Sequence, residues 1–267
     1  AGQFLFFEFI GSRDAYFSSD FYYFHCFRPF LTEWHNFPIT AIFACSPGMR
    51  FVIMEEIWII GVGHFGTIAF QRLSQDNKDR HFVLVDPLEE HLLKCKSPTA
   101  TLEVADGMDF CQKHLKKGCH PDWIIPALPV HLAAEWILLH LGPKRLRRIP
   151  IPPEFEVLVP NPIRGPEGNL YVSHADFRCP ADCDEPRDIC TVTRNIRQQN
   201  MFELLEELDI KPFKALALRS HQLGPGIGGY RPEQLFETMT QVRQARGAIA
   251  LSTACRCHGV ITGLERI

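Results

Sequence analysis

The stretch IWIIGVGHFGTIAFQRL, from Ile57 to Leu73, decides the fold. A short run of β-branched and aromatic residues leads directly into Gly61, Gly63 and Gly66, and a helical pattern follows without a break. In a dinucleotide-binding turn the first glycine permits a tight reversal, the second lets the backbone approach a pyrophosphate, and the third lets the helix pack close to the sheet. The stretch therefore predicts a strand, a phosphate-binding turn and a helix whose first N–H groups face the phosphates.

A second apolar run, HFVLVDP, ends in Asp86, twenty residues beyond Gly66. A carboxylate at this place accepts hydrogen bonds from ribose hydroxyls and repels a 2′-phosphate, which favours NAD over NADP. His64 and Phe65 lie within the turn and are candidate cofactor contacts. The default interpretation of His64, however, is a solvent-exposed residue without a specific role. The alternative is a glycine turn in another kind of α/β domain, with an incidental Asp.

From Met54 onward, strand-like and helix-like segments alternate, which predicts a Rossmann-like, doubly wound parallel sheet with right-handed crossovers. The ligand crevice of such a sheet lies at the carboxyl ends of its strands. Asp106 follows the third expected strand, where it either contacts the adenine side of a cofactor or caps the next helix, and capping is favoured. We expect strands at 57–60, 82–85, 101–104 and 123–125, and helices at 65–74, 88–94, 108–115 and 131–141.

Three strand ends, GVGHFG, LVDP and VADG, resemble the NAD-binding domain of the Trk-type potassium-conductance regulator (RCK) family. The resemblance covers residues 55 to about 141. Members of that family gate potassium channels and transporters as ligand-sensing subunits, often as dimers, so the resemblance implies a membrane transporter as a partner and a homodimer. The sequence after residue 141 does not resemble that family's usual ligand-binding domain, so potassium transport rests on the shared fold alone. The family's NAD-binding residues map onto Gly61, Gly63, Gly66, Asp86 and Asp106.

Three segments are expected along the chain. The first fifty residues hold eleven of the 21 Phe, and residues 1–53 show neither a strand period nor a helical one. We consider three interpretations of them: an upstream extension before a natural start at Met54 or Met49, an irregular aromatic arm, and a membrane-surface anchor. Residues 54–145 form the expected NAD-binding domain. Residues 146–267 form a smaller, cysteine-containing α+β domain, and GPKRLRRIPIPP, from Gly142 to Pro153, reads as the linker between the two.

The smaller domain can be placed only coarsely. Helices are expected at 201–208 and 232–245, and strands at 213–218 and 248–252. Between them SHQLGPGIGGYRP, from Ser220 to Pro232, reads as a glycine-rich loop. Such a loop is either a long turn or a lid that closes over the cofactor and carries His221 as an acid or base.

Five of the ten cysteines fall in two clusters near the end of the chain. Gathered thiolates hold zinc, hold an iron–sulfur cluster or form disulfides. The spacing C-x3-C-x6-C lacks the C-x2-C of zinc ribbons and departs from the standard ferredoxin spacings. No export signal is found, so a cytoplasmic, reducing location is expected, which disfavours disulfides. If the clusters meet, four metal-binding thiolates come together: those of Cys179, Cys183 and Cys190, and that of Cys255 or Cys257. The alternative is that these cysteines are ordinary structural thiols.

Two classes of function remain. The formal net charge of -3 gives no electrostatic case for a nucleic-acid partner. The first class is an NAD(H)-binding regulatory or sensing module. The second is an NAD-dependent oxidoreductase with zinc or an iron–sulfur cluster in its C-terminal domain, which implies a redox partner protein. The sequence does not decide whether the protein is an enzyme.

Overall fold

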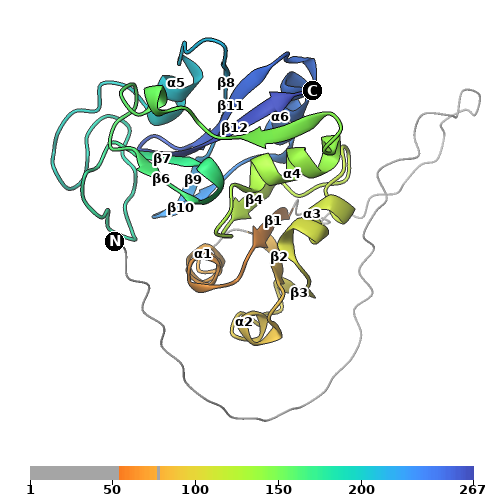
Figure 1. Ribbon diagram of the computed structural model, residues 1–267. Helices are drawn as coiled ribbons and strands as arrows, with labels where there is room; N and C mark the ends of the chain where they lie inside the picture. Colours follow the sequence, from red (N-terminus) through yellow and green to blue (C-terminus); the bar gives the residue numbers. More distant parts are fainter. Residues whose placement is uncertain (1–53, 77–78) are drawn as a thin grey trace, which may run out of the picture. The chain divides into compact units, whose positions relative to one another are not determined.

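The computed structural model describes residues 54–76 and 79–267, which belong to the same compact unit. The three interpretations of residues 1–53 therefore lie outside the described residues. The fold is mixed α/β, and Figure 1 shows its elements in sequence colours.

Four parallel strands form the first sheet, in the order β3-β2-β1-β4. This order is that of the first half of a Rossmann-like sheet, so the expected parallel sheet is confirmed. The register runs along the whole of β1, where Ile57 lies beside Phe82 of β2 and Trp123 of β4. The strands are β1 (Glu55–Ile60), β2 (Arg80–Asp86), β3 (Ala100–Val104) and β4 (Trp123–Pro126).

Helices cover both faces of this sheet, as a doubly wound fold requires. Ile57 and Ile59 of β1 share a buried cluster with Phe70 of the first helix, whereas Trp58 and Ile60 belong to a second cluster, which contains helices α3 and α4. Successive strand residues thus face opposite layers. The helices are α1 (His64–Ser74), α2 (Glu89–Leu93), α3 (Gly107–His114) and α4 (Leu132–Leu141).

A second, mostly antiparallel sheet follows, in the order β6-β7-β12-β11-β8. Strand β11 pairs with β8 in parallel, and the far half of β12 pairs with β5. The strands are β5 (Leu146–Ile149), β6 (Ile163–Arg164), β7 (Leu170–Ser173), β8 (Lys214–Arg219), β11 (Ala248–Ala254) and β12 (His258–Arg266). Helices α5 (Met201–Glu206) and α6 (Pro232–Gln244) and the short 3-10 turns η1 (Pro153–Phe155) and η2 (Pro166–Gly168) complete the fold.

The linker predicted over 142–153 is wrong in part, because strand β5 lies inside it. Its basic residues do not prevent strand formation, since Arg147 reaches across to β12, where its Nε donates to Glu265 Oε2 at 2.6 Å. Pairing along the edge of β12 thus outweighs the local proline signal. The domain boundary between residues 145 and 146 stays a prediction.

The loop predicted over Ser220–Pro232 is also wrong. It folds into a hairpin of β9 (His221–Gly224) and β10 (Ile227–Gly229). The hairpin continues beside β4, because Tyr230 and Ile124 exchange both backbone hydrogen bonds, at 3.0 and 2.9 Å. Strand pairing occupies the glycine-rich segment, so the lid interpretation has no support in the structure.

The main core lies between the two sheets. One buried cluster joins Trp58 and Trp136 of the first half to Leu235, Ile249 and Leu264 of the second. A separate cluster under α5 covers the other face of the second sheet. No helix within the described ranges is long and apolar enough to cross a membrane.

Candidate functional site

The three glycines of the turn have different surroundings. Gly61 has a φ of +93°, and a Cβ on Gly66 would lie 1.9 Å from the carbonyl oxygen of Gly61, so the fold itself requires both glycines. Gly63 differs, because its φ is -66° and a Cβ there would meet nothing within 4 Å. Gly63 is also the N-cap of α1 and offers no side-chain cap. The turn therefore opens outward at the position where a phosphate would approach the helix N-terminus.

Asp86 lies at the end of β2 and is buried, with 6 % of its surface exposed. Its Oδ2 accepts the N–H of Val62 at 2.7 Å, and its Oδ1 accepts the N–H of Leu88 at 2.9 Å. The imidazole Nδ1 of His91 lies 3.1 Å from the same Oδ1. The carboxylate thus fastens the glycine turn to the start of α2, and any ribose contact would use its remaining lone pairs.

The other predicted cofactor contacts lie nearby. His64 and Phe65 are exposed on the first turn of α1, with ring centroids 5.3 Å apart. Asp106 caps α3, since its Oδ1 accepts the N–H groups of Met108 and Asp109 at 2.8 and 3.1 Å. Capping is the role favoured for Asp106 from the sequence.

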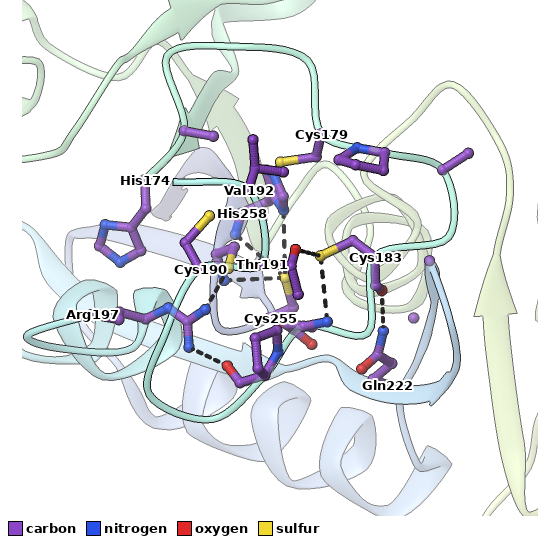
Figure 2. Close-up of a pocket in the computed structure, with 18 of the residues that line it drawn as sticks. His174, Cys179, Cys183, Cys190, Thr191, Val192, Arg197, Gln222, Cys255 and His258 are labelled. Atoms are coloured by element: carbon purple, nitrogen blue, oxygen red, sulfur yellow. Dashed lines mark hydrogen bonds between the residues drawn. The ribbon is translucent and has the colours of Figure 1, made fainter. Parts of the chain in front are cut away.

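The two cysteine clusters meet in one cavity of about 1180 Å³. Its walls come from the first turns of α1, the end of β4, the loop 174–200 and the turn between β11 and β12. Phe65 and Ala127 border it on the side of the parallel sheet, although the three glycines of the turn and Asp86 do not line it. Figure 2 shows the cysteine side chains around this hollow. The lining cysteines are Cys179, Cys183, Cys190, Cys255 and Cys257.

Two basic side chains lie among these sulfurs. The Nε2 of His258 is 3.5 Å from Cys179 Sγ, and its Nδ1 is 3.8 Å from Cys255 Sγ. Arg197 Nη2 donates to Cys257 Sγ at 2.9 Å, while Nη1 donates to two carbonyl oxygens of the same loop at 2.8 Å. The guanidinium therefore ties the loop 174–200 to the turn before β12.

Burial and hydrogen bonding act in opposite directions on these thiols. Burial raises the pKa of Cys255 to about 12 and that of Cys257 to about 11, so both are protonated at neutral pH unless a cation compensates. Hydrogen bonds from Thr193 and Val192 lower the pKa of Cys190, which makes it the most easily ionised of these thiols. None of the five forms a disulfide.

A single metal ion does not fit the present arrangement. Among the described residues, no group of three or more His, Cys, Asp and Glu side chains is placed so that it could hold a metal ion. The predicted zinc site is therefore not preformed, although the predicted meeting of the two clusters is observed.

Sequence reasoning left three cavity residues without a role. His258 follows Cys257 directly in CRCH, which was a usable signal. His174 lines the cavity with an Nε2 that has no hydrogen-bond partner, and burial lowers its pKa. Arg197 carried no signal, because its role depends on a bond across 60 residues of sequence.

His221 lies outside the cysteine cavity. It lines a second cavity of about 370 Å³ with Arg219 and Arg256, and its ring is 5.6 Å from that of Trp123. Burial lowers its pKa. The acid or base role predicted for a lid therefore has no geometry to support it.

Comparison with known proteins places the chain in a family. The family model AF_1314_C, described as "Uncharacterized protein, C-terminal domain", matches residues 133–267. The chain belongs to this family. A relative from Archaeoglobus fulgidus, described as "Uncharacterized protein", is 30% identical over 223 residues, which cover 78% of this chain and 98% of the relative. No solved structure matches significantly. The family match spans β5 to β12, and so includes all five cavity cysteines.

Proposed function

We propose that this member of the AF_1314_C family binds NAD(H) at the carboxyl edge of its parallel sheet and acts as a regulatory or sensing module. The supporting observation is the contrast within the glycine turn. Gly61 and Gly66 are closed in by the fold, whereas Gly63 is open at the uncapped start of α1. An open backbone at a helix N-terminus binds a pyrophosphate through N–H groups and the helix dipole.

The sensing role follows the resemblance to the Trk-type potassium-conductance regulators. On this proposal the bound nucleotide biases contact with a partner, such as a membrane transporter, from a cytoplasmic location, with a homodimer as the expected assembly. Asp86, at the end of β2, would discriminate against the 2′-phosphate of NADP.

A second candidate is an NAD-dependent oxidoreductase. The observation that favours it is the border between the thiol-lined cavity and the glycine-turn helix, where Phe65 of α1 and Ala127 after β4 lie in the cavity wall. A metal or cluster among the thiols would then lie beside the nucleotide site, and a redox protein would be the partner.

Titration of the full chain with NADH and NADPH tests the first proposal through nicotinamide fluorescence. We expect NADH to bind at least about tenfold more tightly than NADPH, since a tenfold ratio needs only about 1.4 kcal/mol. Gly63→Val should abolish binding without changing the far-ultraviolet circular dichroism, because a Cβ at this position meets no protein atom within 4 Å and the side chain would occupy the proposed place of the phosphate. Gln71→Val, on the exposed face of α1, is the matched control. Tight NADH binding by Gly63→Val would disprove the assignment.

A turnover assay separates the two candidates. NADH gives two electrons, which reduce two ferricyanide ions, so consumption of NADH with ferricyanide above the rate of the Gly63→Val protein supports an oxidoreductase. Bound NADH that stays reduced in that assay supports sensing.

A further inference from the structure

Two cysteines of the cavity lie in tight turns whose backbone N–H groups point at the sulfur. Cys183 Sγ receives the N–H of Glu185 at 3.4 Å. Cys255 Sγ receives those of Cys257 and His258, at 3.4 and 3.3 Å. The donor stands two residues after the cysteine in each case, with a second donor three residues after Cys255.

Cys190 lies in the same loop as Cys183, and it lines the same cavity. Donors aimed at a sulfur stabilise the thiolate over the thiol, and hydrogen bonds to cysteine sulfurs are a normal part of thiolate-bound metal clusters. Two cysteines of one cavity therefore have the donors that a shared thiolate-bound ligand would use.

The spacing of the thiols favours a cluster over one ion. Zinc lies about 2.3 Å from each sulfur, which requires thiolates within roughly 4 Å of one another. The described residues contain no such group, yet five sulfurs surround one cavity of about 1180 Å³. Thiolates spread around a larger space suit a cluster of several metal atoms bridged by sulfide.

The length of the loop 174–200 is an independent indication that this loop has a functional role. It connects β7 to α5 and contains no helix or strand, only the isolated bridge between Ile189 and Ile196. Structureless loops longer than about 12–15 residues inside a compact domain usually have a functional role. This loop supplies Cys179, Cys183 and Cys190, and a cluster would fasten it to the end of β11.

The fourth thiolate is Cys255 rather than Cys257. Arg197 already occupies the Cys257 sulfur at 2.9 Å, and the guanidinium is fixed by its two bonds to loop carbonyl oxygens. Cys255 instead accepts backbone N–H groups, as Cys183 does. We infer that Cys179, Cys183, Cys190 and Cys255 bind an iron–sulfur cluster in the cavity beside the glycine-turn helix.

This site deepens the second candidate function, but its occupancy does not depend on NAD(H) binding. Each thiol releases its proton as its sulfur binds iron, and the iron and sulfide come from solution. His258, 3.5 Å from Cys179 Sγ, is placed to accept one of these protons or to donate to a cluster ligand.

The experiment measures metal and acid-labile sulfide in the full chain, purified without oxygen, before and after incubation with iron salts, sulfide and dithiothreitol. We expect two or four iron atoms per chain, an equal amount of sulfide and broad visible absorption. Stoichiometric zinc without sulfide would overturn the inference, and so would a colourless protein that takes up no iron after the incubation.

Single serine variants identify the ligands. Cys179→Ser, Cys183→Ser, Cys190→Ser and Cys255→Ser should each lose most of the iron, whereas Cys257→Ser should keep it. Cys119→Ser, outside the cavity, is the matched control, and circular dichroism excludes misfolding. Gly63→Val should keep a full cluster while losing NADH. In the unsubstituted protein, a cluster without NADH binding would refute the nucleotide proposal alone, and NADH binding without iron would refute this inference alone.

Discussion

At the scale of single residues, the carboxylate of Asp86 stabilises the glycine turn, whereas the sequence predicted for it only a contact with the ribose of the cofactor. It accepts two backbone N–H groups, one of them the buried N–H of Val62 at 2.7 Å. Asp86→Ala leaves that N–H without a partner, so we expect the free energy of unfolding to fall by about 1–3 kcal/mol. Urea unfolding measures this change. Glu90→Ala, an exposed neighbour, should change it by less than about 0.5 kcal/mol. Equal stability of Asp86→Ala and the parent protein would remove the structural role.

His131 predicts a dependence of stability on pH. Its Nδ1 lies 2.7 Å from Thr262 Oγ1, which itself donates to Asn169 Oδ1, and its Nε2 lies 2.8 Å from Thr253 Oγ1. The neutral imidazole therefore donates through Nδ1 and accepts through Nε2. Burial, followed by the charge of Arg148, lowers its pKa from 6.5 to about 3.

The unfolded chain consequently binds one more proton than the folded chain between pH 6.5 and 3. The stabilisation is complete above pH 6.5 and is lost as the pH falls, by about 1.4 kcal/mol per pH unit from this group. Urea unfolding at several pH values measures the slope. In His131→Gln the free energy of unfolding should no longer show the part of this slope that His131 contributes. His64→Gln, at an exposed residue, should leave the slope unchanged. An unchanged slope in His131→Gln would contradict the assignment.

At the scale of elements, periodicity predicted what depends on local sequence and missed what depends on distant pairing. Strands β1 to β4 and helices α1 to α4 alternate along the chain with clear apolar periods, and all eight were expected within a few residues. Strands β5 and β12 and the hairpin β9–β10 were not expected. Prolines and glycines mask them locally. The partner of β5 lies far along the chain, and β9 and β10 pair with each other beside the distant β4.

The candidate site divides in the same way. The glycine turn is encoded in one continuous stretch, and so it was visible in the sequence. The meeting of the cysteines could be stated only as a condition, because it depends on how the loop 174–200 returns to the end of β11. Arg197, whose contact with Cys257 fixes that return, is an unremarkable arginine in the sequence.

Helix α1 is tied to the cysteine loop and to the hairpin through one side chain. Arg72 Nη1 donates to Ala181 O at 2.7 Å and to Pro225 O at 2.6 Å. The N–H of Gly226, in the same hairpin turn, donates to Cys183 O at 3.0 Å. These bonds connect α1, where we propose that the nucleotide binds, to the cysteine loop.

We expect Arg72→Met to loosen the loop 174–200 while leaving the parallel sheet intact, because the bonds it removes are confined to that contact. Hydrogen exchange should become at least about tenfold faster in loop peptides, which corresponds to about 1.4 kcal/mol. Exchange in β1 and β2 should stay unchanged. Arg243→Met, on an exposed turn of α6, is the matched control. Unaltered exchange in the loop would show that Arg72 does not hold it.

At the scale of the whole molecule, the two sheets share one core. Trp58 and Trp136 of the first half and Leu235, Ile249 and Leu264 of the second lie in the same buried cluster. The pairing of Tyr230 with Ile124 adds backbone hydrogen bonds between the halves. Two halves joined in this way lose apolar burial on both sides when either one unfolds, which favours a single cooperative transition.

Ile249→Ala tests that cooperativity. Ile249 is fully buried in β11, so its truncation should cost about 2–5 kcal/mol of unfolding free energy. Because the core is shared, we expect the most protected amides of β1 and β4 to lose as much protection from hydrogen exchange as those of β8 and β12. Val157→Ala, at a side chain with 85% of its surface exposed, is the control and should leave all four strands unchanged. If β1 and β4 keep their protection while β8 and β12 lose theirs, the halves unfold separately, and residues 54–145 form the independent domain that the sequence predicts.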